Sequence, residues 1–180
     1  FITSTLQQAA GSALGFSAST TMRYAQQLYE GVDTPAGHLG LITYMRTDSV
    51  AIAVEAQNAC RDFIRSSYGA EFVPEKPNFY KSKSNAQGAH EAIRPTDVTL
   101  TPESLKDTLD AGQLKLYRLI WRRFLASQMA AAEQLRTTVD VEGSEADSRL
   151  YTFRATATVT TFPGFLKAYN IEAEEGEDWK

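Results

Sequence analysis

The sequence predicts an α+β chain in which a mainly helical part precedes a pair of antiparallel strands. Up to about residue 132, apolar residues recur every three or four positions, which is the period of an amphipathic helix. Beyond Glu133 apolar and polar residues alternate, as they do in a half-buried strand. We therefore expect a domain boundary at this change of period, with one domain over residues 1–132 and another over residues 133–180.

Composition limits what kind of protein this is. The chain has 180 residues, of which 43% are hydrophobic and 22% charged, enough for a globular core. Its net charge of −4 argues against coating nucleic acid by bulk electrostatics, so any contact with DNA must follow a local basic path.

No apolar run predicts a membrane span. The lone cysteine, Cys60, excludes a disulfide framework and favours an intracellular setting. Because the chain starts at Phe1 and not at Met, we expect a piece of a longer protein.

The first two predicted helices are short. Residues 4–14 read as one helix, with Gly11 as an interruption, and Ser17 caps a second helix that stops at Gly31. Their tight connection at residues 15–16 predicts a helix-turn-helix arrangement, although simple helical packing explains the spacing equally well.

The stretch around Tyr44 reads as a strand-to-helix junction. Residues 39–42 form a short apolar run typical of a buried strand, and Ser49 is placed to cap a helix from Ala51 onwards. A phenol with Arg46 two residues on, close to a helix N-terminus, suits attack on a phosphate.

A long segment of low periodicity follows, over residues 70–89. Loops of this length usually have a function or lack order. Lys81 and Lys83, beside Phe79 and Tyr80, suit a nucleic-acid backbone and a stacked base. A solvated surface loop explains the same residues equally well.

The rest of the chain holds one long helix and a hairpin. We expect a helix start at residues 101–103 and a long helix over residues 113–132. Its buried stripe comprises Tyr117, Ile120, Trp121, Phe124 and Met129, and its basic face, which is either solvated or in contact with phosphates, comprises Arg118, Arg122 and Arg123. Strands over residues 135–141 and 151–159 predict an antiparallel pair joined by a polar turn, and the acidic end at 172–178 is not expected to order by itself.

Two blocks of sequence resemble a known family. Residues 42–49, with the sequence ITYMRTDS, resemble the active-site tyrosine motif of the type IA DNA topoisomerases, and residues 89–96, AHEAIRPT, resemble their second signature. The two blocks stand in the family's order and at about its spacing. Met45, Glu91 and Arg94 are more similar to bacterial DNA topoisomerase I than to the topoisomerase III branch.

The resemblance implies a reaction. Enzymes of this family cut one DNA strand through a 5′-phosphotyrosine intermediate and rejoin it without ATP, relaxing negative supercoils. A phenol suits this chemistry because its conjugate base leaves more readily than an alkoxide. Tyr44 is then the nucleophile, and Arg46 stabilises the charge on the scissile phosphate.

The same resemblance gives further residues a role in binding DNA phosphates or organising the site. These residues are His90, Arg94, Asp48, Thr47 and Glu91. Asp48 either orients Arg46 or caps the following helix, and Glu91 also reads as a helix-start residue.

The family's fold implies a winged-helix (CAP-like) tyrosine domain, followed by antiparallel strands of an incomplete arch domain. The family binds Mg²⁺ on acidic residues of an N-terminal Toprim domain, and no such acidic cluster occurs in this chain. We therefore expect a fragment that cuts DNA poorly by itself. The expected partners are DNA, single-stranded at the cleavage site, and the remaining domains of a cytoplasmic, nucleoid-associated parent. A winged-helix module that binds DNA without catalysis remains the alternative, and a reverse gyrase is a smaller one.

Overall fold

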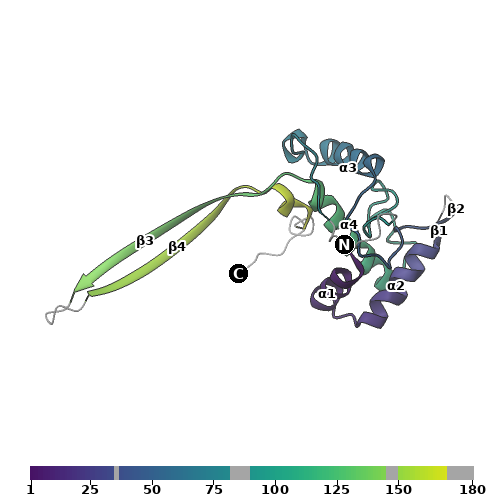
Figure 1. Cartoon of the computed structure of the whole chain (residues 1–180), viewed down its shortest axis with the longest axis horizontal. Helices are drawn as coiled ribbons and strands as arrows, with labels where there is room; N and C mark the ends of the chain where they lie inside the picture. The colour runs from purple at the N-terminus through teal and green to yellow at the C-terminus, as the bar shows by residue number, and fades with distance from the viewer. Residues whose placement is uncertain (35–36, 82–89, 145–149, 170–180) are drawn as a thin grey trace.

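The computed structural model describes residues 1–34, 37–81, 90–144 and 150–169 of the chain. It consists of a helical body and one long hairpin that projects from it (Figure 1). The body contains α1 (Thr3–Leu14), α2 (Ala18–Glu30), β1 (Val32–Thr34), β2 (Gly37–Leu39), α3 (Val54–Ser67), η1 (Ala70–Phe72) and α4 (Ala111–Gln128). The hairpin consists of β3 (Glu133–Ser144) and β4 (Leu150–Phe162), and the chain returns to the body as η2 (Gly164–Ala168). This mixture of helices and small antiparallel sheets confirms the α+β prediction.

The first two helices lie close to their predicted positions. Ser17 caps α2 by accepting a hydrogen bond from the backbone N–H of Thr20, and α2 ends before Gly31, whose φ is 115°. The predicted interruption at Gly11 is wrong, because α1 continues through it. The helix ends instead at Gly15, which takes the left-handed conformation with φ 68° and donates its N–H back into the last turn.

Helix α4 is the centre of the body, in contact with α1, α2, α3 and η2 (Figure 1). All five residues of its predicted buried stripe are buried. Tyr117 donates its hydroxyl to the carbonyl of Leu100 at 2.6 Å, and the Trp121 indole N–H donates to the carbonyl of Val98 at 2.9 Å. The polar ends of two core aromatics are therefore satisfied, and they fix the preceding loop on the helix.

The predicted ends of α4 need correction. The helix begins at Ala111, where the carboxylate of Asp110 accepts the N–H groups of Gly112 and Gln113, and it ends at Gln128. Residues 101–103 form turns and do not start a helix.

The strand-to-helix junction around Tyr44 also differs from the prediction. Strand β2 ends at Leu39, and Ile42 makes only an isolated antiparallel bridge, with Pro95. Helix α3 begins at Val54, and Ser49 does not cap it; the hydroxyl of Ser49 instead accepts the N–H of Ala51 in a local turn. Tyr44 therefore lies in an irregular segment well before α3, not at a helix N-terminus.

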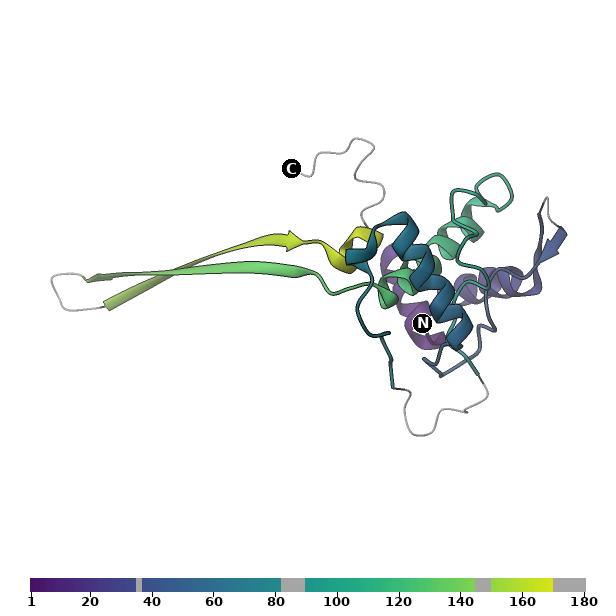
Figure 2. The same cartoon turned by 90° about the horizontal axis from the view of Figure 1, so that it is seen from above.

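The hairpin confirms the predicted antiparallel pair. Its first strand begins at Glu133, where the spacing of apolar residues changes from the helical period to alternation. Figure 2 shows both strands leaving the helices behind along almost their whole length. Leu135 lies opposite Val159, and Val141 opposite Phe153, so one face is largely apolar. All four of these side chains are exposed. The predicted turn at residues 145–148 and the acidic end at 172–178 lie outside the described residues.

At the base of the hairpin, the chain packs back onto the body. The ring of Phe162 lies 5.0 Å from the ring of Phe72, and Ala168 in η2 is fully buried. Among the residues that the structure describes, no helix combines the length and the apolar character needed to cross a lipid bilayer.

Candidate active site

The two sequence blocks that carry the family resemblance lie side by side. The N–H of Thr43 donates to the carbonyl of Arg94 at 2.9 Å, and the hydroxyl of Thr43 accepts the N–H of Arg94 at 3.0 Å. Two residues further along, the N–H of Thr96 donates to the carbonyl of Leu41 at 3.0 Å. The structure therefore joins the blocks, although Thr43 and Arg94 are 51 residues apart in the chain.

Two helices hold the backbone on either side of Tyr44. At the start of α1, the hydroxyl of Thr3 lies 2.8 Å from the carbonyl of Met45 and accepts the N–H of Thr47 at 2.9 Å. At the end of α2, the carbonyl of Leu28 accepts the N–H of Leu41 at 2.7 Å. These bonds explain why the segment is fixed without belonging to a strand or a helix.

Side chains along this segment alternate between the interior and the surface. The exposed residues are Tyr44, Arg46 and Asp48, and the buried residues are Met45, Thr47 and Ser49. Met45 is 1% exposed and anchors the segment in the core. The hydroxyl of Thr47 accepts the N–H of Ser49 at 3.0 Å, so Thr47 faces the protein's own backbone. The three exposed side chains present a phenol, a guanidinium and a carboxylate to solvent.

Tyr44 contacts two aromatic rings from distant parts of the chain. The ring of Tyr29, in the last turn of α2, meets it edge-on at a centroid distance of 5.2 Å, and the ring of His90 lies at 6.2 Å. The side chain of Tyr44 is 40% exposed and makes no hydrogen bond to any residue that the structure describes. The structure thus places His90 of the second block beside Tyr44, and it adds Tyr29, to which no sequence motif pointed.

Arg46 and Asp48 do not contact each other. Within the described part of the chain, neither side chain forms an ion pair or a hydrogen bond, and α3 begins only at Val54. The expected capping role of Asp48 is therefore wrong, whereas its expected role in orienting Arg46 stays a prediction. The guanidinium of Arg46 is exposed, and no described residue pairs with it.

Glu91 and Arg94 form a partly buried pair next to the site. The Nε of Arg94 donates to Oε2 of Glu91 at 2.8 Å, and another guanidinium nitrogen donates to the carbonyl of Pro95 at 2.9 Å. Oε2 of Glu91 also accepts the N–H of Ala53, at 3.2 Å, at the start of α3. Partial burial alone would raise the pKa of Glu91, but the hydrogen bonds from Arg94 and Ala53 outweigh it and hold this pKa below its ordinary value. Glu91 thus lies at the start of α3, although it does not itself belong to that helix.

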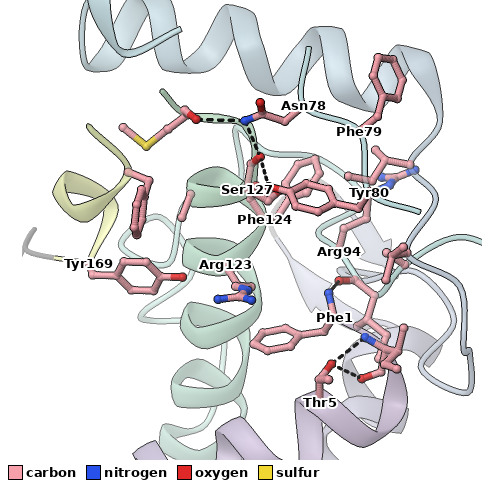
Figure 3. Close-up of a pocket in the computed structure, with 18 of the residues that line it drawn as sticks. Phe1, Thr5, Asn78, Phe79, Tyr80, Arg94, Arg123, Phe124, Ser127 and Tyr169 are labelled. Atoms are coloured by element: carbon pink, nitrogen blue, oxygen red, sulfur yellow. Dashed lines mark hydrogen bonds between the residues drawn. The ribbon is translucent and has the colours of Figure 1, made fainter. Parts of the chain in front are cut away.

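A cavity of about 700 Å³ lies beside the second block, and Arg94 is one of the residues that line it (Figure 3). Arg123 of α4 extends over the ring of Phe1, 5.7 Å from its centroid. Phe79 and Tyr80 line another part of this cavity, and Lys81 follows them at the surface. The predicted DNA-path residue Lys83 lies outside the described residues.

Hydrogen bonds hold the residues on both sides of Phe79. The side-chain amide of Asn78 donates to the carbonyls of Ser127 and Met129 at 3.0 and 3.1 Å, and the hydroxyl of Tyr80 donates to the carbonyl of Ser127 at 2.9 Å (Figure 3). Phe79 between them is 78% exposed. An exposed ring on a fixed backbone is suited to stacking.

Within the described residues, no group of three or more His, Cys, Asp or Glu side chains is placed to hold a metal ion. This described part of the chain therefore does not fit Mg²⁺.

A comparison with protein families identifies the chain. The model of the family described as DNA topoisomerase matches residues 1–179. The chain belongs to the DNA topoisomerase family. This match, together with the bacterial relatives described next, confirms the resemblance of its two sequence blocks to DNA topoisomerases of the bacterial topoisomerase I type.

Related topoisomerases cover nearly the whole chain. The chain is 46% identical to DNA topoisomerase 1 of Fervidobacterium islandicum, covering 100% of this chain and 26% of the relative, and 51% identical to that of Helicobacter pylori, covering 93% and 22%. The structure of full-length topoisomerase I from Thermotoga maritima superposes with a TM-score of 0.78 at 44% identity, covering 99% of this chain and 28% of that one. The chain thus spans about a quarter of the length of these topoisomerases.

Proposed function

We propose that this chain is the tyrosine-bearing part of a type IA DNA topoisomerase and that Tyr44 is its nucleophile. The phenolic oxygen attacks the phosphorus of one backbone linkage, the bond from phosphorus to the 3′ oxygen breaks, and that oxygen leaves with a proton. The 5′ end stays on the tyrosine. Because one phosphodiester replaces another, the reverse reaction rejoins the strand without ATP. Supporting this, Tyr44 is an exposed phenol on a segment fixed by both signature blocks.

Arg46 is the proposed stabiliser of the scissile phosphate. Its guanidinium is exposed on the same face as Tyr44 and is not occupied by any described residue. Removing one donor aimed at the charge that develops in a transition state typically costs about 2.7–4 kcal/mol. An unoccupied cation two residues from the nucleophile supports this role.

The other motif residues divide into two proposed roles. His90, whose ring lies beside Tyr44, contacts a phosphate next to the cut. Thr47, Glu91 and Arg94 organise the site, since their polar groups are bonded to the protein's own backbone and to one another. Asp48 is exposed and faces the DNA side of the segment.

We further propose that residues 1–132 form a winged-helix-like tyrosine domain and residues 133–180 part of an arch. The close connection of α1 to α2 and the short β1–β2 hairpin support the first assignment. An exposed apolar face on the long hairpin supports the second, because such a face needs covering by further strands. In the parent protein, a Toprim domain outside this chain would bind Mg²⁺, so the chain by itself cuts DNA poorly. The DNA substrate implies a cytoplasmic, nucleoid-associated setting.

A path for single-stranded DNA is proposed along the segment before the second signature block. Lys81 and Lys83 neutralise phosphates there, and Phe79 stacks on a base. Arg123, in the cavity that Phe79 also lines, adds a third cation. Replacing Phe79 with alanine should weaken oligonucleotide binding by about 1–3 kcal/mol, the usual contribution of one stacked base.

The test of the proposed function uses the full-length parent protein with Mg²⁺ and a 3′-labelled single-stranded oligonucleotide. We expect a protein–DNA adduct that survives denaturation in the native protein and is absent in Tyr44→Phe. Tyr151→Phe is the matched control, because Tyr151 has the same exposed fraction of 40% but lies on the hairpin. The 180-residue chain alone should form little or no adduct.

Either of two results would overturn this proposal. If Tyr44→Phe forms the same adduct, another residue is the nucleophile. If no adduct forms while the chain still binds DNA, the chain is a DNA-binding module without catalysis, and Tyr44 only packs or stacks.

A further inference from the structure

Tyr29 lies against the proposed nucleophile but belongs to neither signature block. It occupies the last turn of α2, is 40% exposed, and meets the ring of Tyr44 edge-on, with an angle of 65° between the ring planes. This T-shaped geometry places the positive edge of one ring on the negative face of the other. The contact is a specific arrangement of two surface rings and not the packing of a core.

The backbone fixes Tyr29 relative to Tyr44. Leu28, its neighbour, is fully buried and accepts the N–H of Leu41. The carbonyl of Tyr29 passes so close to Gly40 that a Cβ atom there would lie 2.7 Å from it. The end of α2 therefore abuts the start of the tyrosine segment, and Tyr29 cannot shift without moving that segment.

The side chain of Tyr44 has few other constraints. Its backbone neighbours are hydrogen-bonded or buried, but its own hydroxyl has no partner among the described residues. The direction of the phenol therefore depends on its side-chain torsions, and those depend on the rings of Tyr29 and His90. An in-line attack is sensitive to such a direction, since a misplacement of about 1 Å can cost on the order of a hundredfold in rate.

We infer that Tyr29 is a positioning residue, whose ring holds the phenol of Tyr44 in the direction needed to attack the DNA phosphate. Its ring and not its hydroxyl performs this role, because the contact is made by ring edge and ring face. This inference rests on the proposed function of Tyr44.

The test compares Tyr29→Leu and Tyr29→Phe in the full-length protein. Loss of this aromatic pair should slow single-turnover cleavage of an oligonucleotide about two- to tenfold. Tyr29→Phe should cleave at the native rate. Binding of the same oligonucleotide, measured in a Tyr44→Phe background so that no adduct forms, should be unchanged by Tyr29→Leu.

Tyr24→Leu is the matched control. Tyr24 lies on the same helix and pairs with the ring of Phe16 at 5.5 Å, so this change also removes one aromatic pair, but not the one at Tyr44. In NMR spectra of the 180-residue chain, the ring protons of Tyr44 should shift in Tyr29→Leu and not in Tyr24→Leu. If Tyr29→Leu melts earlier than Tyr24→Leu, Tyr29→Gln provides the second variant without a ring.

Three outcomes overturn the inference. Native cleavage by Tyr29→Leu means that the ring is not needed, and weakened binding in proportion to cleavage means that Tyr29 contacts DNA. Equal damage in Tyr29→Phe means that the hydroxyl acts. None of these affects the proposed function, which fails only if the adduct persists in Tyr44→Phe or never forms.

Discussion

Glu91 and Arg94 form an ion pair of 2.8 Å next to the candidate active site, with the arginine side chain only 11% exposed. The same carboxylate oxygen closes the start of α3 through the N–H of Ala53. One side chain thus connects the second signature block with the helix that follows the first.

The ion pair of Glu91 with Arg94 predicts that the stability of the protein depends on pH. Because the folded protein holds the pKa of Glu91 below its ordinary value of 4.5, the ionised carboxylate stabilises the fold above that value. The contribution disappears as the pH falls through the folded-state pKa. Glu91→Gln should reduce the free energy of unfolding by about 1 kcal/mol at neutral pH and by less in acid, measured by urea unfolding at several pH values. A cost that does not shrink in acid would contradict this account.

His38 makes the stability of the protein depend on pH in a second way, with the opposite sign. One ring nitrogen lies 2.9 Å from Oδ1 of Asp33 and the other 3.2 Å from the carbonyl of Glu30, so both bonds form only when both nitrogens carry protons. The hydrogen bond to Asp33, followed by that to Glu30, raises the pKa of His38 above 6.5. Its stabilisation is therefore complete below that value and is lost as the pH rises through the folded-state pKa. NMR titration should show the raised pKa, and Asp33→Asn should lower it; no change in Asp33→Asn would argue against the pairing.

Cys60 should be unreactive in the native chain. It is fully buried in α3, and burial raises the pKa of its thiol to about 12, against a smaller opposing effect of Arg61. At mildly alkaline pH, a thiol reagent such as Ellman's reagent should label it only as fast as the protein unfolds, and completely in denaturant. Rapid labelling of the folded chain would show that α3 opens locally.

Gly40 should not tolerate a side chain. A Cβ there would lie 2.7 Å from the carbonyl oxygen of Tyr29, a backbone atom that cannot turn aside. Gly40→Ala should therefore destabilise the protein by about 1–3 kcal/mol in thermal or urea unfolding, the usual cost of overpacking.

Gly11→Ala is the control for this substitution. Gly11 lies inside α1, and its nearest neighbour would be 3.6 Å from a new Cβ, which is ordinary contact. Alanine should stabilise the helix there by about 0.5–1 kcal/mol. If both variants lose the same stability, the close approach at Gly40 is not the cause.

The sequence allowed good prediction wherever the signal was local. Ser17 caps α2 through a bond to a residue three positions away, and the stripe of α4 follows from its own period. The prediction that Ser49 caps a helix failed because the segment after Tyr44 is held by bonds from Thr3 and from Glu91 of the second signature block, which no short window of sequence contains. The strands β1 and β2, with three residues each, are too short for an alternating pattern to appear.

The candidate site shows the same division. Tyr44, Arg46 and His90 could be named from motifs, because the family resemblance carries information that periodicity does not. Tyr29 could not, since its importance arises only from where α2 ends in space. The capping role of Asp48 failed for a related reason: it assumed that α3 begins near Ser49, whereas the helix begins at Val54.

The long hairpin begins and ends at one place on the helical body. Glu133 is paired with Phe162, and the chain then continues directly into η2. The chain therefore leaves the helical body and returns to it at the same point. A two-residue turn of the kind that closes ordinary hairpins would bypass the long hairpin and leave the route of the chain through the body unchanged. The same junction is also a natural acceptor site for a foreign domain whose termini lie close together.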